Sequence, residues 1–302
     1  MEAQTGMTSQ ENDMEQLFGF FSECTSHWNF LRNMKHVDWL KISRQYYTWK
    51  GREKGGSAIP RLVHQIWLGA PPPAEVRLLM DRWRDNPYGF EYKLWRDQDI
   101  DKEGLDLNDL YMRAKNPATR SDIARYEILK RYGGIYVDAD VELIKNMEDV
   151  LRGSSFVAGC HPCPDNGDVE VGNAVIASSK DGRVVTEIVK ELSLLKEVDE
   201  KDAMTIIKAS GPLMLTRVLL GNENDSSVGI LPSNHFYPFP GFLKDTHEDA
   251  RSFAVSSTYT IHHWNCSWMK YLGTKRKRTR VPTVVRHVID RLKQSITKKG
   301  KT

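Results

Sequence analysis

The chain has 302 residues, 40% of them hydrophobic and 27% charged, a composition that excludes collagen-like and low-complexity classes and is typical of a globular protein. No apolar run approaches the roughly 20 residues that cross a bilayer as a helix, and the first residues lack the basic and apolar regions of a signal peptide. We therefore expect a cytoplasmic protein of one large domain or two smaller ones.

The net charge of +3 hides an asymmetry between residues 274–302 and the rest. This tail carries eleven Lys or Arg and one acid, Asp290, so its charge is about +10 and that of the rest about −7. Apolar residues of the tail fall on one helical stripe: Val285, Val288, Ile289, Leu292 and Ile296. Such a helix over residues 275–296 suits an anionic membrane surface, and packing on the body is the alternative. Nucleic-acid binding is not expected, because no recognised module accompanies the charge.

The first predicted elements are helical. Apolar and aromatic residues between 14 and 50 keep helical spacing, which indicates two or three short helices, and the Gly- and Pro-containing stretch 51–60 reads as a loop. Residues 1–58 are therefore predicted to form an N-terminal helical extension.

A strand, helix, strand and helix follow, predicted at residues 61–69, 71–87, 90–95 and 105–115. The clearest helix begins after Asn116, a favourable N-cap, with Pro117 in its first turn, and it ends at Gly133. Residues 135–144 then read as one strand. Further strands are predicted at 155–159, 173–177, 228–231 and 258–263, and helices at 183–195 and 212–220. This alternation predicts an α/β fold with a mostly parallel sheet.

Four cysteines are too few for a disulfide scaffold in a chain of this length, so we expect reduced thiols at Cys24, Cys160, Cys163 and Cys266. Residues 160–163 have CxxC spacing, but no second CxxC follows. A turn with buried thiols is therefore favoured over a zinc site.

Two acids, Asp138 and Asp140, stand at or near the end of a run that otherwise reads as a buried strand. If the strand continues, both carboxylates face the same side; if it ends, they lie at its carboxyl end, where α/β sheets bind ligands. Oxygen ligands of this kind suit Mg²⁺ or Mn²⁺, and solvated acids on a surface are the alternative. Asp122 and Arg125 share one face of the preceding helix, either as a ligand-binding pair or as a local ion pair.

Five segments occur together in one order: residues 59–69, 121–142, 172–178, 210–216 and 261–268, read as IPRLVHQIWLG, SDIARYEILKRYGGIYVDADVE, GNAVIAS, SGPLMLT and IHHWNCSW. In these segments the chain resembles the DXD-containing sugar transferases (glycosyltransferase family 32-like), which include the yeast initiation-specific mannosyltransferase and, more distantly, the glucosyltransferase domains of clostridial toxins. The resemblance implies a GT-A fold over residues 59–273, with one Rossmann-like mixed sheet flanked by helices, between the extension 1–58 and the basic helical tail 274–302.

The resemblance also implies roles for residues near the acids. Trp67 would stack on the nucleotide base, although a core position is the better interpretation from the residue alone. Asp122 and Arg125 would hold the ribose and sugar of the donor. Tyr136 would help to hold the donor, and Asp138 would contact ribose or sugar and reach the metal.

Asp140 would ligate the metal directly, and Asn173 would lie near the donor sugar. At the end of the last strand one of two histidines would face the site, and His263 is preferred over His262 as the third metal ligand. Ser267 and Trp268 would close over the diphosphate.

These expectations predict a retaining glycosyltransferase that uses Mn²⁺ or Mg²⁺ and moves a hexose from a UDP- or GDP-linked sugar to a glycan, lipid or protein hydroxyl. Two other classes remain open. In a metal-dependent phosphohydrolase an acid of the DxD would be the nucleophile, but Val141 and Glu142 follow the acids where a hydroxyl residue is expected. In an inactive carbohydrate-binding protein the acids and Arg125 would not need to be intact.

Overall fold

The computed structural model describes residues 9–24, 36–162, 168–221 and 225–265. Several predictions concern residues outside these ranges: the basic tail 274–302 with its membrane-binding segment 275–296, the diphosphate contacts Ser267 and Trp268, and the thiols Cys163 and Cys266. The other two cysteines, Cys24 and Cys160, are buried, as the preferred interpretation expects.

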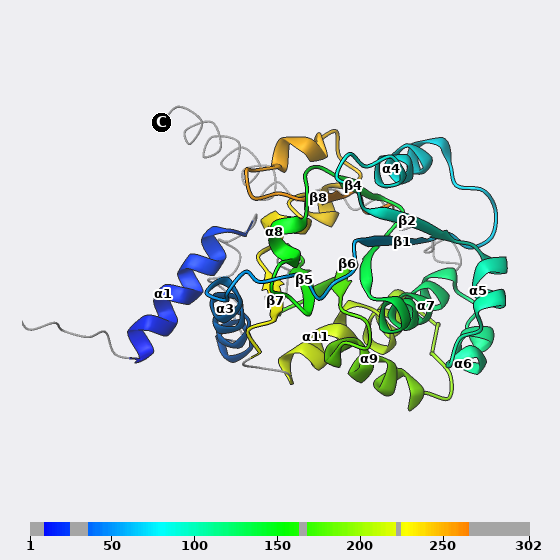
Figure 1. The fold of residues 1–302 in the computed structure, drawn as a ribbon, viewed down its shortest axis with the longest axis horizontal. Helices are drawn as coiled ribbons and strands as arrows, with labels where there is room; N and C mark the ends of the chain where they lie inside the picture. Colours follow the sequence, from blue (N-terminus) through cyan, green and yellow to red (C-terminus); the bar gives the residue numbers. More distant parts are fainter. Residues whose placement is uncertain (1–8, 25–35, 163–167, 222–224, 266–302) are drawn as a thin grey trace, which may run out of the picture.

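A six-stranded mixed sheet forms the centre of the fold (Figure 1). Its strands lie in the order β2-β1-β3-β6-β5-β7. Their bounds are β1 Leu62–Ile66, β2 Glu91–Trp95, β3 Gly134–Val137, β5 Phe156–Cys160, β6 Val171–Ser178 and β7 Val228–Leu231. Strand β6 runs antiparallel to both neighbours, whereas the other pairs are parallel. A single mixed sheet flanked by helices confirms the predicted fold class.

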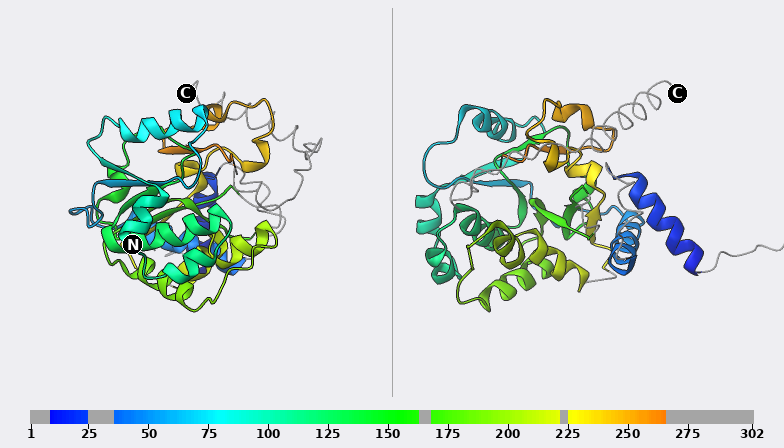
Figure 2. Two further views of the ribbon diagram at one scale, coloured as in Figure 1. Left: turned by 90° about the vertical axis from the view of Figure 1, so that its right-hand side faces the viewer. Right: turned by 180° about the vertical axis from the view of Figure 1, so that it is seen from behind.

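Helices cover both faces of this sheet, α7, α9 and α11 on one face and α4 on the other (Figures 1 and 2). Helix α4 packs on a small second sheet of β4 Val141–Leu143 and β8 Thr260–His262. The helices of the body are α4 Ala74–Arg84, α5 Asp97–Glu103, α6 Asn108–Arg113, α7 Pro117–Tyr132, α8 Glu148–Leu151, α9 Arg183–Ser193, α10 Ala203–Ala209, α11 Pro212–Leu220 and α12 Ser233–Phe236. Strand β4 follows β3 in the chain and pairs with β8 in this small sheet. The small sheet forms one wall of the site described below.

Helix α7 begins and ends as its sequence predicts. The side chain of Asn116 accepts a hydrogen bond from the N–H of Ala118 at 2.9 Å, and Pro117 occupies the first turn. Gly133 ends the helix with φ 65°, and a Cβ there would lie 2.6 Å from the backbone nitrogen of Lys180. At Gly134, with φ 100°, a Cβ would lie 2.3 Å from the carbonyl oxygen of Leu62. These two glycines let the chain pass directly from α7 into β3 alongside β1.

The predicted single strand at residues 135–144 is wrong. Strand β3 ends at Val137, residues 138–140 form a turn, and β4 belongs to the other sheet. Every residue of β3 and of β4 is buried, so the sequence reads as one buried strand interrupted by two acids, and periodicity alone does not reveal the break. Asp138 and Asp140 therefore lie at the carboxyl end of a central strand, on a turn rather than on one strand face.

Two N-terminal helices, α1 Ser9–Ser22 and α3 His36–Lys50, confirm the helical reading of this region. Helix α3 packs along β7, the edge strand of the sheet, where the amide of Gln45 donates to the Val228 carbonyl at 2.6 Å. Trp49 lies against Gly229, at which a Cβ would be 2.7 Å from the indole nitrogen. Helix α3 thus covers the edge of the sheet, α1 packs on α3, and both helices contribute to the main hydrophobic core. The domain boundary at residue 58 remains a prediction.

Among the described residues, one stretch is long and apolar enough to cross a membrane, Ala203–Leu220, with mean hydropathy 1.3. The structure divides it into α10 and α11 around Gly211, and 44% of it is buried. Met214, Leu215 and Leu219 belong to the hydrophobic core. Core packing therefore accounts for the apolar character of this stretch.

Candidate active site

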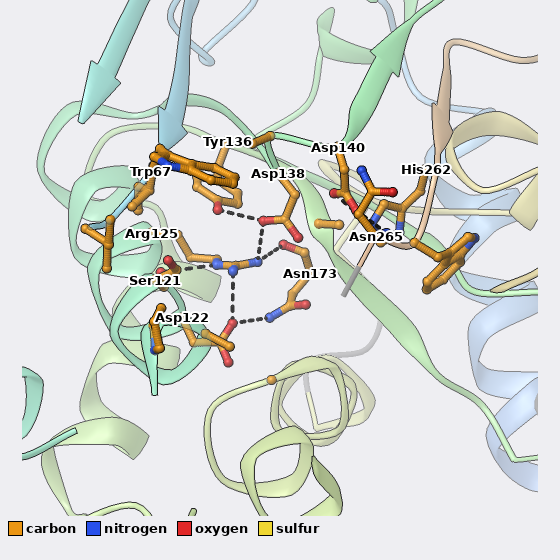
Figure 3. A pocket seen from close by; sticks show the side chains of 18 of the residues that line it. Trp67, Ser121, Asp122, Arg125, Tyr136, Asp138, Asp140, Asn173, His262 and Asn265 are labelled. Atoms are coloured by element: carbon orange, nitrogen blue, oxygen red, sulfur yellow. Dashed lines mark hydrogen bonds and ion pairs between the residues drawn. The ribbon is translucent and has the colours of Figure 1, made fainter. Parts of the chain in front are cut away.

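A pocket of about 400 Å³ opens at the carboxyl ends of β1 and β3 (Figure 3). The parallel register of Val63 with Ile135 places the ends of these strands at one edge, as expected for ligand sites in α/β sheets. Eight of the residues assigned from the sequence are described, and all except His263 line the pocket: Trp67, Asp122, Arg125, Tyr136, Asp138, Asp140 and Asn173. His262, the alternative to His263, lines it as well.

Arg125 lies at the centre of a buried polar network on α7. Its guanidinium is 3.1 Å from Asp122 and 3.3 Å from Asp138, and it donates to the carbonyl of Asn173 at 2.6 Å. The ring of Tyr136 lies 4.4 Å below the same cation. Burial by itself would lower the pKa of Arg125, but Asp138 and its other neighbours hold the pKa above its ordinary value. The pair is therefore part of a pocket wall and not a solvated helix ion pair.

Asp122 is held from three directions. Oδ1 accepts from Arg125 and from the amide of Asn173 at 2.9 Å, and Oδ2 accepts from the hydroxyl of Ser210 at 2.9 Å. Burial raises the pKa of Asp122 to about 6, against the opposing effects of Arg125 and Ser210. The carboxylate is thus oriented by the protein, and its ionisation depends on the positive charge of Arg125.

A bulge in β6 positions Asn173. The register of β5 with β6 shifts between Ala158, opposite Ile176, and Gly159, opposite Gly172, so residues 173–175 of β6 have no partner on β5. The carbonyl of Asn173 is free to accept from Arg125, and that of Ala174 accepts from the N–H of Asp138 at 2.8 Å. Bulges commonly re-aim side chains beside active sites, and this one joins β6 to the carboxylate turn.

Asp138 and Tyr136 form one unit. The hydroxyl of Tyr136 donates to Oδ1 of Asp138 at 2.6 Å, and burial keeps the pKa of this phenol well above its ordinary value, so it stays a donor. Tyr136 is only 1% exposed, whereas the side chain of Asp138 is 28% exposed. Tyr136 therefore lies beneath Asp138 and orients it, while Asp138 presents its carboxylate to the pocket.

Asp140 faces the last strand. Its Oδ1 lies 3.2 Å from Nε2 of His262, and its Oδ2 accepts from the N–H of Asn265 at 2.7 Å. Burial raises the pKa of Asp140, but His262 and the Asn265 N–H outweigh this, and the pKa lies below the ordinary value of 3.8. Ligand atoms of Asp138, Asp140 and His262 lie within 4.8 Å of one another, a grouping that can hold one metal ion.

The preference for His263 as the third ligand is wrong in this geometry. The antiparallel register places His262 directly opposite Val141, next to the carboxylate turn. Consecutive residues in a strand point to opposite sides, so His263 turns away, and its Nε2 lies 3.0 Å from Glu142. The register joins segments about 120 residues apart, and local sequence carries no information about it.

Glu142 supports the small sheet from behind the site. Its side chain is 2% exposed and pairs with Arg82 at 3.0 Å, with Arg251 and with His263. Burial alone would raise the pKa of Glu142, but these partners lower it to about 2. Because the pKa is lowered from 4.5, the stabilisation by Glu142 is present above pH 4.5 and is lost as pH falls toward 2.

Replacing Glu142 by Gln is expected to lower the free energy of unfolding at neutral pH by about 1–3 kcal/mol, because the two half-exposed arginines lose a buried partner but regain water. Chemical denaturation at pH 7 and pH 3 checks this. The difference between Glu142→Gln and the parent should shrink at the lower pH. A constant difference would contradict the assignment.

Trp67 lies at the rim of the pocket rather than in the core that its residue type suggested. It follows β1, and its backbone N–H donates to Trp95 at 3.0 Å, which continues the strand pairing. The indole N–H donates to the Ala70 carbonyl at 2.6 Å, and the half-buried ring packs on Val76. A ring fixed in this way can stack on a planar ligand.

Several residues of the site had no predicted role: Asn265, Trp264, His161 and Glu170 line the pocket, whereas Ser210 does not line it but donates to Asp122. Ser210, Trp264 and Asn265 lie within segments that carried the resemblance, so the motifs contained a signal for them. His161 and Glu170 lie at the two ends of the β5–β6 connection. His161 belongs to the CxxC stretch at residues 160–163, and Glu170 belongs to no motif found in the sequence. The pairing of β5 with β6 brings these two side chains together in the pocket.

Comparisons with known proteins show similarity to glycosyltransferases. Residues 73–157 match the family model described as "Glycosyltransferase sugar-binding region containing DXD motif". The chain is 27% identical over 226 residues to an uncharacterized glycosyltransferase of Acanthamoeba polyphaga mimivirus, covering 71% of this chain and 85% of that protein. It is 25% identical over 192 residues to inositol phosphoceramide mannosyltransferase 3 of Schizosaccharomyces pombe, covering 62% of this chain and 51% of that protein. The chain thus spans about half the length of this yeast relative.

One similar solved structure is a glycosyltransferase involved in glycosylation of the major capsid of the virus PBCV-1, with a TM-score of 0.42 and 13% identity over 71% of this chain and all of that one. Together these findings show that residues 73–157 match the model of the DXD-containing sugar transferase family and that relatives of the chain are named glycosyltransferases, in agreement with the resemblance seen in the sequence.

Proposed function

We propose that this enzyme uses a divalent cation and transfers a hexose from a UDP- or GDP-linked sugar to a hydroxyl group, with retention at the anomeric carbon. One observation carries the proposal. Three groups that could hold a metal ion, Asp138, Asp140 and His262, share a pocket with the buried network of Asp122 and Arg125. A site for a metal-bound diphosphate thus lies beside side chains that can bind sugar hydroxyls.

The residues fit a metal ion of the predicted kind. Two carboxylates and one imidazole suit Mn²⁺ and also accept Mg²⁺. When bound, the ion supplies positive charge that neutralises the departing nucleoside diphosphate. Asp138 and Asp140 would hold it, and His262 replaces His263 as the proposed third ligand.

The protein's own groups are positioned before the donor arrives. Trp67 would stack on the base, since its indole is fixed by Ala70 at the end of the pocket away from His262 (Figure 3). Asp122, Arg125 and Asn173 would bind hydroxyls of the ribose and the hexose, because their mutual hydrogen bonds leave them oriented at the pocket wall. Most of the catalysis would come from this positioning and from charge stabilisation at the leaving group.

The phosphohydrolase alternative is disfavoured by the surroundings of the first acid. Oδ1 of Asp138 is engaged by Tyr136 and Arg125, and Val141 and Glu142 follow the acids where this class of enzyme is expected to have a hydroxyl residue. Asp140 is likewise held by the N–H of Asn265. Phosphate release without sugar transfer would support the hydrolase.

The acceptor that we propose is a hydroxyl of a lipid-linked polyol or glycan. The yeast relative is named an inositol phosphoceramide mannosyltransferase, which favours a lipid acceptor over a protein. The basic segment 275–296 would then hold the enzyme at an anionic membrane face. Co-sedimentation of the full chain with vesicles of phosphatidylserine and phosphatidylcholine should be salt-sensitive, and equal binding to neutral vesicles would contradict this part.

The test combines nucleotide binding with two histidine variants. Calorimetric titration with UDP, GDP and their hexose conjugates should show binding that requires Mn²⁺ for one nucleotide series. His262→Ala is expected to weaken Mn²⁺ binding by about tenfold or more, because a direct ligand is lost. His263→Ala, the matched control on the next residue, should leave Mn²⁺ binding within about twofold and lower stability through Glu142.

Metal-independent nucleotide binding, or equal effects of the two histidine variants, would contradict the proposed centre. The anomeric configuration of the product, measured by proton NMR, decides retention separately. A screen of UDP- and GDP-hexoses for slow Mn²⁺-dependent hydrolysis identifies the donor.

A further inference from the structure

A histidine–glutamate pair lines the same pocket without a role in the scheme above. Cys160 of β5 pairs with Val171 of β6, so His161 and Glu170 face each other one step further along. The N–H of His161 donates to the Glu170 carbonyl at 2.8 Å, and Nδ1 of the ring lies 2.7 Å from Oε1 of Glu170. Both side chains line the pocket.

The imidazole of His161 is held tightly. Its ring centroid lies 4.7 Å from that of Tyr237 and 4.9 Å from that of Trp264, both edge to face. A Cβ on Gly172 would lie 2.3 Å from Nε2, so only glycine allows the ring this position. Nε2 is buried and has no hydrogen-bond partner among the described residues. The fold thus fixes the ring although its Nε2 has no hydrogen-bond partner among the described residues. This indicates that the contact of Nδ1 with Glu170 has a functional role.

Glu170 has one oxygen to offer. Oε1 is engaged by His161, and no hydrogen bond to Oε2 exists within the described part of the chain. The side chain is 23% exposed and lines the pocket. His161 lowers the pKa of this carboxylate even though burial raises it, so Glu170 is ionised at neutral pH. An ionised carboxylate with a free oxygen is a strong acceptor for a ligand hydroxyl.

The pair lies on the side of the metal-ligating group away from Trp67. Trp264, which contacts His161, also stacks on His262 with centroids 4.1 Å apart, and His262 contacts Asp140. Figure 3 shows Trp67 on one side of Asp138 and His262 on the other. If the base of the donor lies at Trp67 and its diphosphate at Asp140, the end of the pocket beside His161 and Glu170 is open to the second substrate.

We propose that Glu170 binds a hydroxyl of the acceptor and that His161 is its positioning residue. This inference rests on the proposed transfer function and deepens it by assigning an acceptor subsite for a polyol, either a sugar or a cyclitol. The free oxygen of Glu170 accepts the hydrogen bond of one hydroxyl and thereby fixes the orientation of the ring that carries the attacking hydroxyl. No bond is made or broken at Glu170.

The experiment compares transfer with hydrolysis, because water attacks the donor without an acceptor subsite. The full chain is assayed with Mn²⁺ and the donor from the screen, with methyl α-D-mannopyranoside, lactose and myo-inositol as probes. Glu170→Gln and His161→Asn are expected to lower the ratio of transfer to hydrolysis about tenfold or more through a raised KM for the probe. The rate of donor hydrolysis should stay within about twofold of the parent.

A matched control is Glu23→Gln. Glu23 also lies beside a histidine, His235 at 3.9 Å, but neither residue lines the pocket. This variant should leave the ratio of transfer to hydrolysis unchanged. Thermal melting of each variant shows whether it is folded under the assay conditions.

Three results would overturn the inference. In the first, Glu170→Gln keeps the parent ratio. In the second, hydrolysis and transfer fall together, which would assign the pair to donor binding or to the fold. In the third, the parent hydrolyses the donor but none of the three polyols changes the products or the rate. A parent that neither binds nor hydrolyses any nucleotide sugar refutes the proposed function instead, and so the two failures are distinct.

Discussion

Asp140→Ala is expected to lower kcat/KM by on the order of 10³-fold, because it removes a proposed direct metal ligand and with it the charge opposite the leaving diphosphate. Asp140 contacts His262 and the N–H of Asn265 at the pocket, and its side chain is 14% exposed. These contacts can be replaced by water, so the melting temperature should change little. The measurement is sugar transfer or donor hydrolysis at saturating Mn²⁺, with Mn²⁺ affinity from calorimetry.

Two further variants separate charge from shape. Asp140→Asn keeps the acceptor for the Asn265 N–H but lacks the charge, and it should lose nearly as much activity as Asp140→Ala. Asp106→Asn removes an acid whose side chain is 66% exposed, away from the pocket, and should be silent. Full activity of Asp140→Ala would remove the metal assignment on which the proposed function depends.

Arg125→Met is expected to abolish measurable transfer and to lower the free energy of unfolding by about 3–5 kcal/mol. The variant leaves Asp122 buried without its cation, and Asp138 loses one of its two orienting partners. Removing a positive neighbour raises the pKa of Asp122 above its present value of about 6. A neutral Asp122 accepts hydroxyl hydrogen bonds poorly, so donor binding should weaken as well.

Arg125→Lys keeps the charge but not the planar fork that reaches Asp122, Asp138 and the Asn173 carbonyl together. We expect transfer to fall about 10²-fold, with a smaller loss of stability than in Arg125→Met. Denaturant unfolding and the pH profile of kcat/KM are the measurements. The acid limb of Arg125→Lys should stay close to that of the parent, because the lysine keeps a positive charge beside Asp122. If Arg125→Met, Arg125→Lys and the parent had equal free energies of unfolding, the contacts of Arg125 with Asp122 and Asp138 would not stabilise the fold.

Much of the fold is predictable from the sequence where local signals act alone. Helix α7 follows from Asn116 and Pro117 at its start and Gly133 at its end, each of which works through its own backbone geometry. The strands around it follow from short apolar runs between turn residues. The break after Val137 is missed because β3 and β4 are both buried along their whole length and only three residues separate them, although they belong to different sheets.

The site divides in the same way. Asp122 and Arg125 are brought together by helical spacing, which is visible in the sequence, and Asp138 lies at the end of the strand that follows. Trp67 is ambiguous from its type, because only the pairing of β1 with β3 puts it at the rim. The partnership of His161 with Glu170 depends on the pairing of β5 with β6.

The sequence by itself determined the kinds of chemical group available: two acids after a strand, an acid and an arginine on one helix face, and two histidines near the last strand. Only the tertiary structure decided that His262, and not its neighbour, meets Asp140, and that Glu170 lines the same pocket with no hydrogen bond to its Oε2 from the described residues. The physical reason is that local patterns report which face of an element is buried. Strand register between distant segments is set by the packing of the whole chain.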